Sequence, residues 1–151
     1  MKTIKQTFAI LFMGLIFNFV QAQESPKPVL NLADIDLFVK TSVQMTKELD
    51  ELGIEIDDDS NTWSANEKVK AILTKHGWAY QSFGDKFAAI SWGFSYLTMI
   101  NHIDKMPEDQ KEAGEQMKKT YTEQYKNLVH DDDLKLIKSK MKDLDAMDWK
   151  E

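Results

Sequence analysis

Apolar side chains recur every three or four positions along most of the chain after residue 30, which is the spacing of one helix face. In the segment 32–52 this repeat has a single gap, at Ser42, and Gly53 follows where a glycine often terminates a helix. The pattern predicts a first helix over 32–52. Its apolar stripe consists of Ile35, Phe38, Met45, Leu49 and Leu52.

A second, shorter helix is predicted after a polar loop. Ser64 and Glu67 have the spacing of a capping box, in which two side chains satisfy free backbone N–H groups at a helix start. The helix would bury Val69, Ile72 and Leu73 and stop at Gly77. A third helix is expected to start near Ser82.

The third predicted helix contains the least charged part of the chain. From Phe87 to Ile103 there is no Asp, Glu, Lys or Arg, yet several polar side chains interrupt the run. A membrane span would be longer and less polar, so the pattern favours the central helix of a bundle. Gly93, in its middle, is expected to let a neighbouring helix approach.

Two more helices are predicted in the C-terminal third. Pro107 suits the first turn of a helix that buries Met117, Tyr121, Tyr125 and Leu128. The last helix would bury Leu134, Ile137, Met141 and Leu144, and Trp149 is expected to fold back on the bundle. No strand-like alternation or hairpin turn is present. We therefore expect an all-α, single-domain bundle of about five helices over 31–151, preceded by an extended leader over 23–30.

The N-terminus is typical of a secretory signal peptide. Two lysines precede an apolar run over 8–20, and Val20-Gln21-Ala22 offers small residues where a signal peptidase cuts. An uncleaved anchor is the alternative, but the run is shorter than the ~20 residues of a spanning helix. The sequence thus predicts a cleaved signal over 1–22. It also predicts export to the periplasm or the medium, with no stable membrane span after cleavage.

Composition narrows the possible chemistry. The 151 residues carry a net charge of −6, contain no cysteine, and use lysine for all 19 basic positions. Without cysteine the chain can form no disulfide, thiol nucleophile or cysteine zinc site. An acidic protein without arginine is also a poor match for a phosphate backbone, so we expect no nucleic-acid binding.

Two short segments resemble known proteins. The first helix opens with Asp34-Ile35-Asp36-Leu37-Phe38, and the second is joined to the third by Lys75-His76-Gly77-Trp78-Ala79-Tyr80-Gln81-Ser82-Phe83. This arrangement resembles a group of small, secreted, all-helical bacterial proteins of unassigned function, which implies a helical fold and transfers no functional residue. The stretch Met106-Pro107-Glu108-Asp109-Gln110 is similar to the LTxxQ motif of helical periplasmic chaperones, with Met and Pro in place of Leu and Thr.

The acidic loop before the second helix is a candidate metal site. Asp57, Asp59 and Asn61 fall at positions 1, 3 and 5 of an EF-hand-like calcium loop, where oxygen ligands are needed. Thr62 replaces the turn glycine at position 6, and Lys68 replaces the glutamate at position 12. The alternative is a solvated acidic loop.

The three histidines suggest a zinc site less strongly. His76, His102 and His130 each fall near the C-terminal end of a predicted helix, where the helix dipole favours a cation. No two of them have the spacing of ligands on one helix. We expect them to cap helices.

An aromatic group in the middle of the chain could line a pocket for an apolar ligand. Its members are Trp78, Phe87, Trp92, Phe94 and Tyr96. Core packing is the commoner use of such residues.

Because reaction motifs are absent, the sequence favours a non-enzymatic binding or interaction protein of the cell envelope. Its partner would be a protein or an apolar small molecule, and no cofactor is expected. The alternatives are a metal-binding protein that uses the 57–61 loop, a chaperone-like helical protein, and an enzyme assembled from distant residues.

Overall fold

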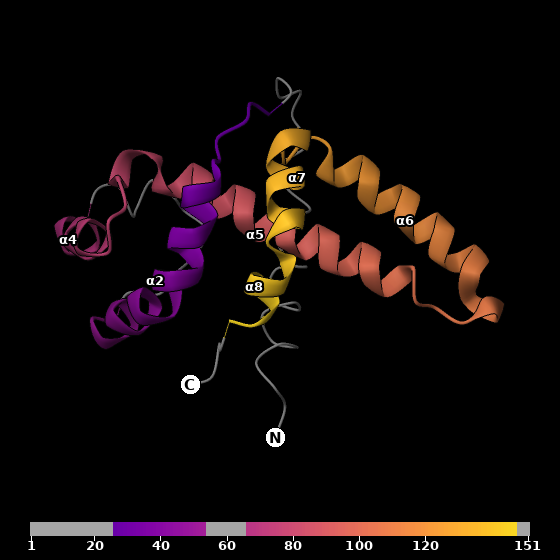
Figure 1. Cartoon of the computed structure of the whole chain (residues 1–151), viewed down its shortest axis with the longest axis horizontal. Helices are drawn as coiled ribbons and strands as arrows, with labels where there is room; N and C mark the ends of the chain where they lie inside the picture. The colour runs from indigo at the N-terminus through magenta and orange to yellow at the C-terminus, as the bar shows by residue number, and fades with distance from the viewer. Residues whose placement is uncertain (1–25, 54–65, 148–151) are drawn as a thin grey trace.

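The computed structural model describes residues 26–53 and 66–147, and within these residues every regular element is helical (Figure 1). The all-α, single-domain prediction is confirmed. The elements are α2 (Leu32–Glu51), α4 (Glu67–Lys75), α5 (Tyr80–Ile103), the 3-10 helix η2 (Glu108–Gln110), α6 (Lys111–Tyr125), α7 (Asp131–Ser139) and α8 (Met141–Asp145).

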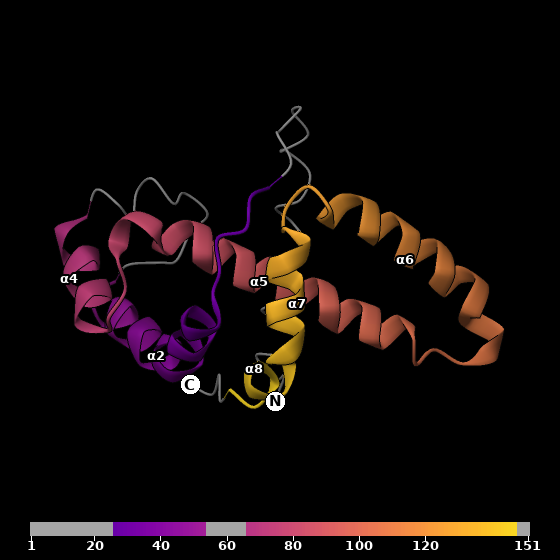
Figure 2. The same cartoon turned by 45° about the horizontal axis from the view of Figure 1, so that its top comes forward.

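The 24-residue helix α5 forms the axis of the molecule. Helices α2 and α4 lie at its N-terminal part, and α7 crosses its middle (Figures 1 and 2). Helix α6 returns along the C-terminal part of α5, so that these two segments form an arm that extends away from the other helices (Figure 2). The hydrophobic core therefore sits where α2, α4 and α7 meet α5, and the arm stands beside it.

Helix α2 begins and ends as its sequence dictates. The Asn31 side chain accepts the Asp34 N–H at 3.1 Å, and the Asp34 carboxylate accepts the Asn31 N–H at 2.9 Å. This reciprocal capping box fixes the first turn. At the other end Gly53 has φ +65°, a left-handed conformation that glycine adopts without strain. Ser42, the gap in the apolar stripe, is 2% exposed and thus lies on the buried face.

Helix α4 begins later than predicted. Asn66 is its N-cap, with the side-chain oxygen accepting the N–H groups of Lys68 and Val69. Glu67 is then the first helical residue and pairs with Lys70 at 2.6 Å. The predicted capping box involves Ser64, which lies outside the described residues, so the box stays a prediction. The predicted stop at Gly77 is confirmed by its φ of +86°.

Helix α5 begins at Tyr80, two residues before the expected Ser82, with Ala79 as N-cap. Gly93 lies where α7 crosses it. A Cβ at this position would clash with Cδ1 of Ile137 and would lie 3.3 Å from Cδ2 of Leu134. The glycine therefore permits the close approach of α7, as predicted.

The last predicted helix is two helices, because the chain breaks at Lys140. The Lys140 N–H bonds the Ile137 carbonyl at 3.0 Å, a tight-turn spacing, and φ at Lys140 is −111°. Its ammonium group reaches back to Asp36 on α2 at 2.6 Å. The break lets Ile137 on α7 and Leu144 on α8 both face the core. A repeat of apolar residues alone does not show such a bend.

No helix in the described part of the chain is long and apolar enough to span a bilayer.

Candidate functional site

The acidic-loop residues Asp57, Asp59 and Asn61 lie outside the described residues, as does Ser64. Among residues 26–53 and 66–147, no three His, Cys, Asp or Glu side chains are placed to hold a metal ion together. Calcium binding by the loop therefore stays a prediction.

The histidines lie on three different helix ends. His76 is the C-cap of α4, and His102 is in the last turn of α5. His130 is instead the N-cap of α7, where its Nδ1 accepts the Asp132 N–H at 3.1 Å. Its expected place at a helix C-terminus was wrong, because α6 ends at Tyr125 and a neutral imidazole can act as an acceptor.

Of the predicted pocket aromatics, Trp78 is part of the core and Phe87 is half-buried and packs against it. Trp78 is 4% exposed, and its indole N–H donates to the Thr41 hydroxyl at 3.1 Å. The Phe87 ring lies 5.6 Å from that of Phe83 and 6.0 Å from that of Phe38. These residues stabilise the junction of α2 with α5 through apolar burial and ring contacts.

The other three aromatics occupy the middle of α5. Trp92 and Phe94 are half-buried and pack against the core cluster. Tyr96 faces α6 instead: its hydroxyl lies 3.0 Å from that of Thr122, and its ring lies 5.2 Å from the Tyr125 ring. The five aromatics thus divide between the core and the arm. The hollow described below is lined by other residues.

A buried carboxylate that sequence reasoning missed ties the leader to the bundle. Asp133, in the first turn of α7, is 1% exposed. Its two oxygens accept the backbone N–H groups of Val29 and Leu30, each at 3.0 Å. Bonds from neutral donors to a buried charge are strong, so the described part of the leader is held on α7. Asp133 is one of three consecutive aspartates, and nothing in the sequence distinguishes it from its neighbours.

A charged cluster joins α2 to α4. Both carboxylate oxygens of Glu48 bond the Lys75 ammonium, at 2.8 and 2.9 Å. Nε2 of His76 lies 3.3 Å from the same carboxylate. The bond from Lys75 lowers the pKa of Glu48 from 4.5 to about 2. Among the described residues, Glu48 bonds Lys75 and Gln44 and lies beside His76, so the cluster holds two helices together.

The outermost helix, α6, is weakly covered. Of its 15 residues only Gly114 and Tyr125 are buried. A Cβ on Gly114 would lie 3.2 Å from both Ile103 and Met106, so the backbone of α6 rests on the end of α5 there. Gly114 and Tyr125 are eleven residues apart, about three helical turns, and so share one face.

The prediction of which α6 residues are buried is therefore only partly confirmed. Tyr125 is buried, and Tyr121 and Leu128 are half-buried, but Met117 is 39% exposed. Met117 is three residues from Gly114, which places it about 60° around the helix from the contact with α5. The predicted burial of Met117 was wrong. Helix α6 packs on α5 through Gly114, so the helix face that contains Met117 is turned away from α5.

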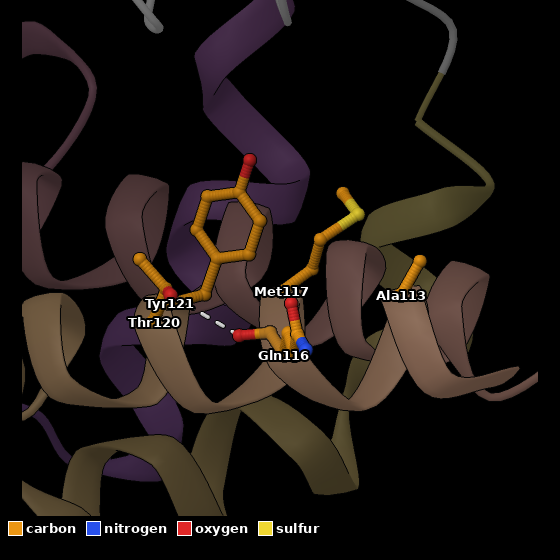
Figure 3. Close-up of a pocket in the computed structure, with 5 residues that line it drawn as sticks. All are labelled: Ala113, Gln116, Met117, Thr120 and Tyr121. Atoms are coloured by element: carbon orange, nitrogen blue, oxygen red, sulfur yellow. Dashed lines mark hydrogen bonds between the residues drawn. The ribbon is translucent and has the colours of Figure 1, made fainter.

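This row forms a side of α6 that carries no charge. The residues around a hollow of about 370 Å³ follow the spacing of one helix face: Ala113, Gln116, Met117, Thr120 and Tyr121. Figure 3 shows the side chains of Ala113, Met117 and Tyr121 pointing the same way from the helix, with a bond of 3.1 Å from the Thr120 hydroxyl to the Gln116 carbonyl beside them. We name these five residues the α6 face.

The fold and this face define a class: a single-domain helical protein with an exposed, uncharged helix face. No protein-family model, curated protein or solved structure matches the chain.

Proposed function

We propose that this chain is an exported, non-enzymatic interaction protein that binds a helical segment of a partner protein through the α6 face. The observation that carries the proposal is the position of Met117. It is 39% exposed at the centre of an uncharged face, on a helix that buries only two residues against its own chain. Methionine is over-represented on surfaces that accept apolar partner side chains, because it is flexible and polarizable.

The shape of the face favours a protein over a small molecule. Ligand pockets are concave and bury most of the ligand surface. The α6 face is lined by residues of a single helix, spaced over two turns. A partner helix can lie along such a row with its own apolar residues at matching intervals.

The chemistry of the face favours binding over catalysis. It offers a thioether, an amide, two hydroxyls and a methyl group, with no carboxylate, ammonium or imidazole among the five residues. General acid–base chemistry needs a group that titrates near the working pH. The face provides none.

Export rests on the N-terminal sequence, with its two lysines, apolar run and Val20-Gln21-Ala22 site. The mass of the protein recovered from its host tests this part. A chain that begins at Gln23 supports export, and a chain that still carries residues 1–22 opposes it.

Site-specific photo-crosslinking in the host tests the binding face. A photoreactive amino acid replaces Met117 in one variant and Lys119 in another. Lys119 is also exposed, and two residues turn a helix by about 200°, so it faces away from Met117. We expect one discrete adduct from position 117 and none from 119. Equal adducts from both positions, or none from 117, would overturn the proposal.

A further inference from the structure

Met117 is the most accessible methionine in the part of the chain that the structure describes. It is 39% exposed, whereas Met45 is 1% and Met147 is 7% exposed. The other three described methionines are half-buried: Met99, Met106 and Met141. Figure 3 shows the Met117 thioether at the end of a side chain that points away from the helix. An oxidant dissolved in water therefore reaches this sulfur atom more readily than the others.

We propose that Met117 is a site of oxidative modification, where a hydroperoxide converts its thioether into a sulfoxide and thereby releases the partner of the α6 face. The release of the partner rests on the proposed function, whereas the site of oxidation does not. The chain contains no cysteine, so no thiol of its own competes for the oxidant. Reductase enzymes convert methionine sulfoxide back to methionine, so the change is reversible.

The reaction needs only the thioether and the hydroperoxide. A lone pair of the Met117 sulfur attacks the hydroxyl oxygen of the hydroperoxide, and the S–O bond forms as the O–O bond breaks. The leaving alkoxide then takes the proton of the transferred hydroxyl group and departs as an alcohol, or as water where the oxidant is hydrogen peroxide. The sulfur loses two electrons and the peroxide gains them, so the step is balanced without a further reactant.

The sulfoxide changes the chemistry of the α6 face. Its oxygen is a strong hydrogen-bond acceptor at the centre of an uncharged row of residues. In the free protein water hydrates this oxygen. A partner that covers the face would strip the water away, and the apolar side chains that the face is proposed to accept offer no donor in return, which is unfavourable. Met117 lies outside the core cluster, so oxidation should weaken binding while the fold keeps its stability.

Peptide masses of the purified protein, sampled during treatment with hydrogen peroxide, test the site of oxidation. We expect Met117 to gain one oxygen roughly tenfold faster than Met45, because a buried sulfur reacts only when the structure opens locally. Met117→Leu is the matched variant, since it keeps an apolar side chain and removes the thioether, and it should lose the fast phase. Equal rates at Met117 and Met45 in the folded protein, or faster oxidation at a half-buried methionine, overturn the proposal.

Photo-crosslinking with Met117 left in place tests the release of the partner. A photoreactive amino acid replaces Ala113, one turn before Met117 on the α6 face. The purified protein is oxidised, the peroxide is removed with catalase, and the protein is irradiated with the envelope fraction of its host. We expect oxidation to lower the yield of the adduct roughly tenfold. The Tm should not change.

The same experiment in the Met117→Leu background identifies the residue responsible. Its adduct should form equally well before and after peroxide treatment. An adduct from the Met117 protein that oxidation leaves unchanged overturns the release of the partner, and so does an equal loss of adduct in the Met117→Leu background. Absence of an adduct from untreated protein instead contradicts the proposed function, and the release with it, while the peptide masses still decide the site of oxidation.

Discussion

Replacement of Gly93 by alanine tests the packing of α7 on α5. The added methyl group would meet Cδ1 of Ile137, and Ile137 is 0% exposed. The isoleucine is therefore enclosed by other side chains and cannot move out into solvent. Overpacking costs about 1–3 kcal/mol, and the fully buried Ile137 places this substitution in the upper part of that range, about 2–3 kcal/mol. Alanine returns about 1 kcal/mol of helix propensity. We therefore expect Gly93→Ala to lower the free energy of unfolding by about 1–2 kcal/mol and the Tm by roughly 2–8 °C.

Gly114→Ala is the matched control. It makes the same change in the first half of α6, where the new methyl group would lie 3.2 Å from Cγ2 of Ile103 and 3.2 Å from Sδ of Met106. Met106 is half-buried and flexible, so it can move by the few tenths of an ångström required. The gain in helix propensity should then offset the contact, and the Tm should stay constant or rise.

A double-mutant cycle with Ile137→Val isolates the cause. This change removes Cδ1, the clashing atom, and by itself costs about 0.5–1.5 kcal/mol. In the Gly93→Ala background its cost should fall to about zero, because it also relieves the clash. Thermal unfolding followed by circular dichroism measures all four proteins. An equal cost of Ile137→Val in both backgrounds, or a Gly93→Ala protein as stable as the wild type, would refute the reasoning.

Three further predictions follow from buried or charged groups. Asp133→Asn should lower the free energy of unfolding by about 2–3 kcal/mol, because the amide can accept only one of the two N–H groups and leaves a buried donor unpaired. Hydrogen exchange at the Val29 and Leu30 amides should become faster, and unchanged exchange would contradict the prediction. Glu48 has a folded pKa of about 2 against 4.5 when unfolded, so its contribution is full above pH 4.5 and is lost as the pH falls toward 2. Glu48→Gln should therefore unfold with a weaker dependence on pH over that interval, and an unchanged slope would count against the Lys75 bond. If the 57–61 loop binds calcium, added calcium should raise the Tm in the wild type and not in Asp57→Asn; a constant Tm in the wild type ends that hypothesis.

Much of the fold could be predicted from spacing. The apolar stripe of α2 from Ile35 to Leu49, the glycines at the ends of α2 and α4, and the close approach at Gly93 follow from helix periodicity and the properties of glycine. Leu52, predicted as the last member of that stripe, is the C-cap and is 45% exposed, because the helix ends before it. Each is a local signal, readable within one or two turns. The break at Lys140 was missed because its long-range partner, Asp36, lies more than a hundred residues away in the sequence.

The candidate site was harder to predict, for a related reason. Periodicity shows which residues of α6 are apolar, but the face that packs is chosen by its neighbour. Gly114 lets the backbone of α6 approach the end of α5, and Met117 is left at the side. The role of Asp133 could not be predicted for the same reason. Its partners are backbone N–H groups of the leader, and a pattern of side chains does not show such contacts.

The most direct test of the α6 face is the affinity for the partner recovered by crosslinking at position 117. Met117→Asp places a charge at the centre of the face while changing an exposed residue, so the fold should stay stable. Lys119→Asp introduces the same side chain on the opposite side of the helix. Titration calorimetry should show at least tenfold weaker binding for Met117→Asp. Lys119→Asp should bind within about twofold of the wild type, an energy difference below about 0.5 kcal/mol. Wild-type affinity in Met117→Asp, or equal losses in the two variants, would contradict the assignment of the α6 face as the binding surface.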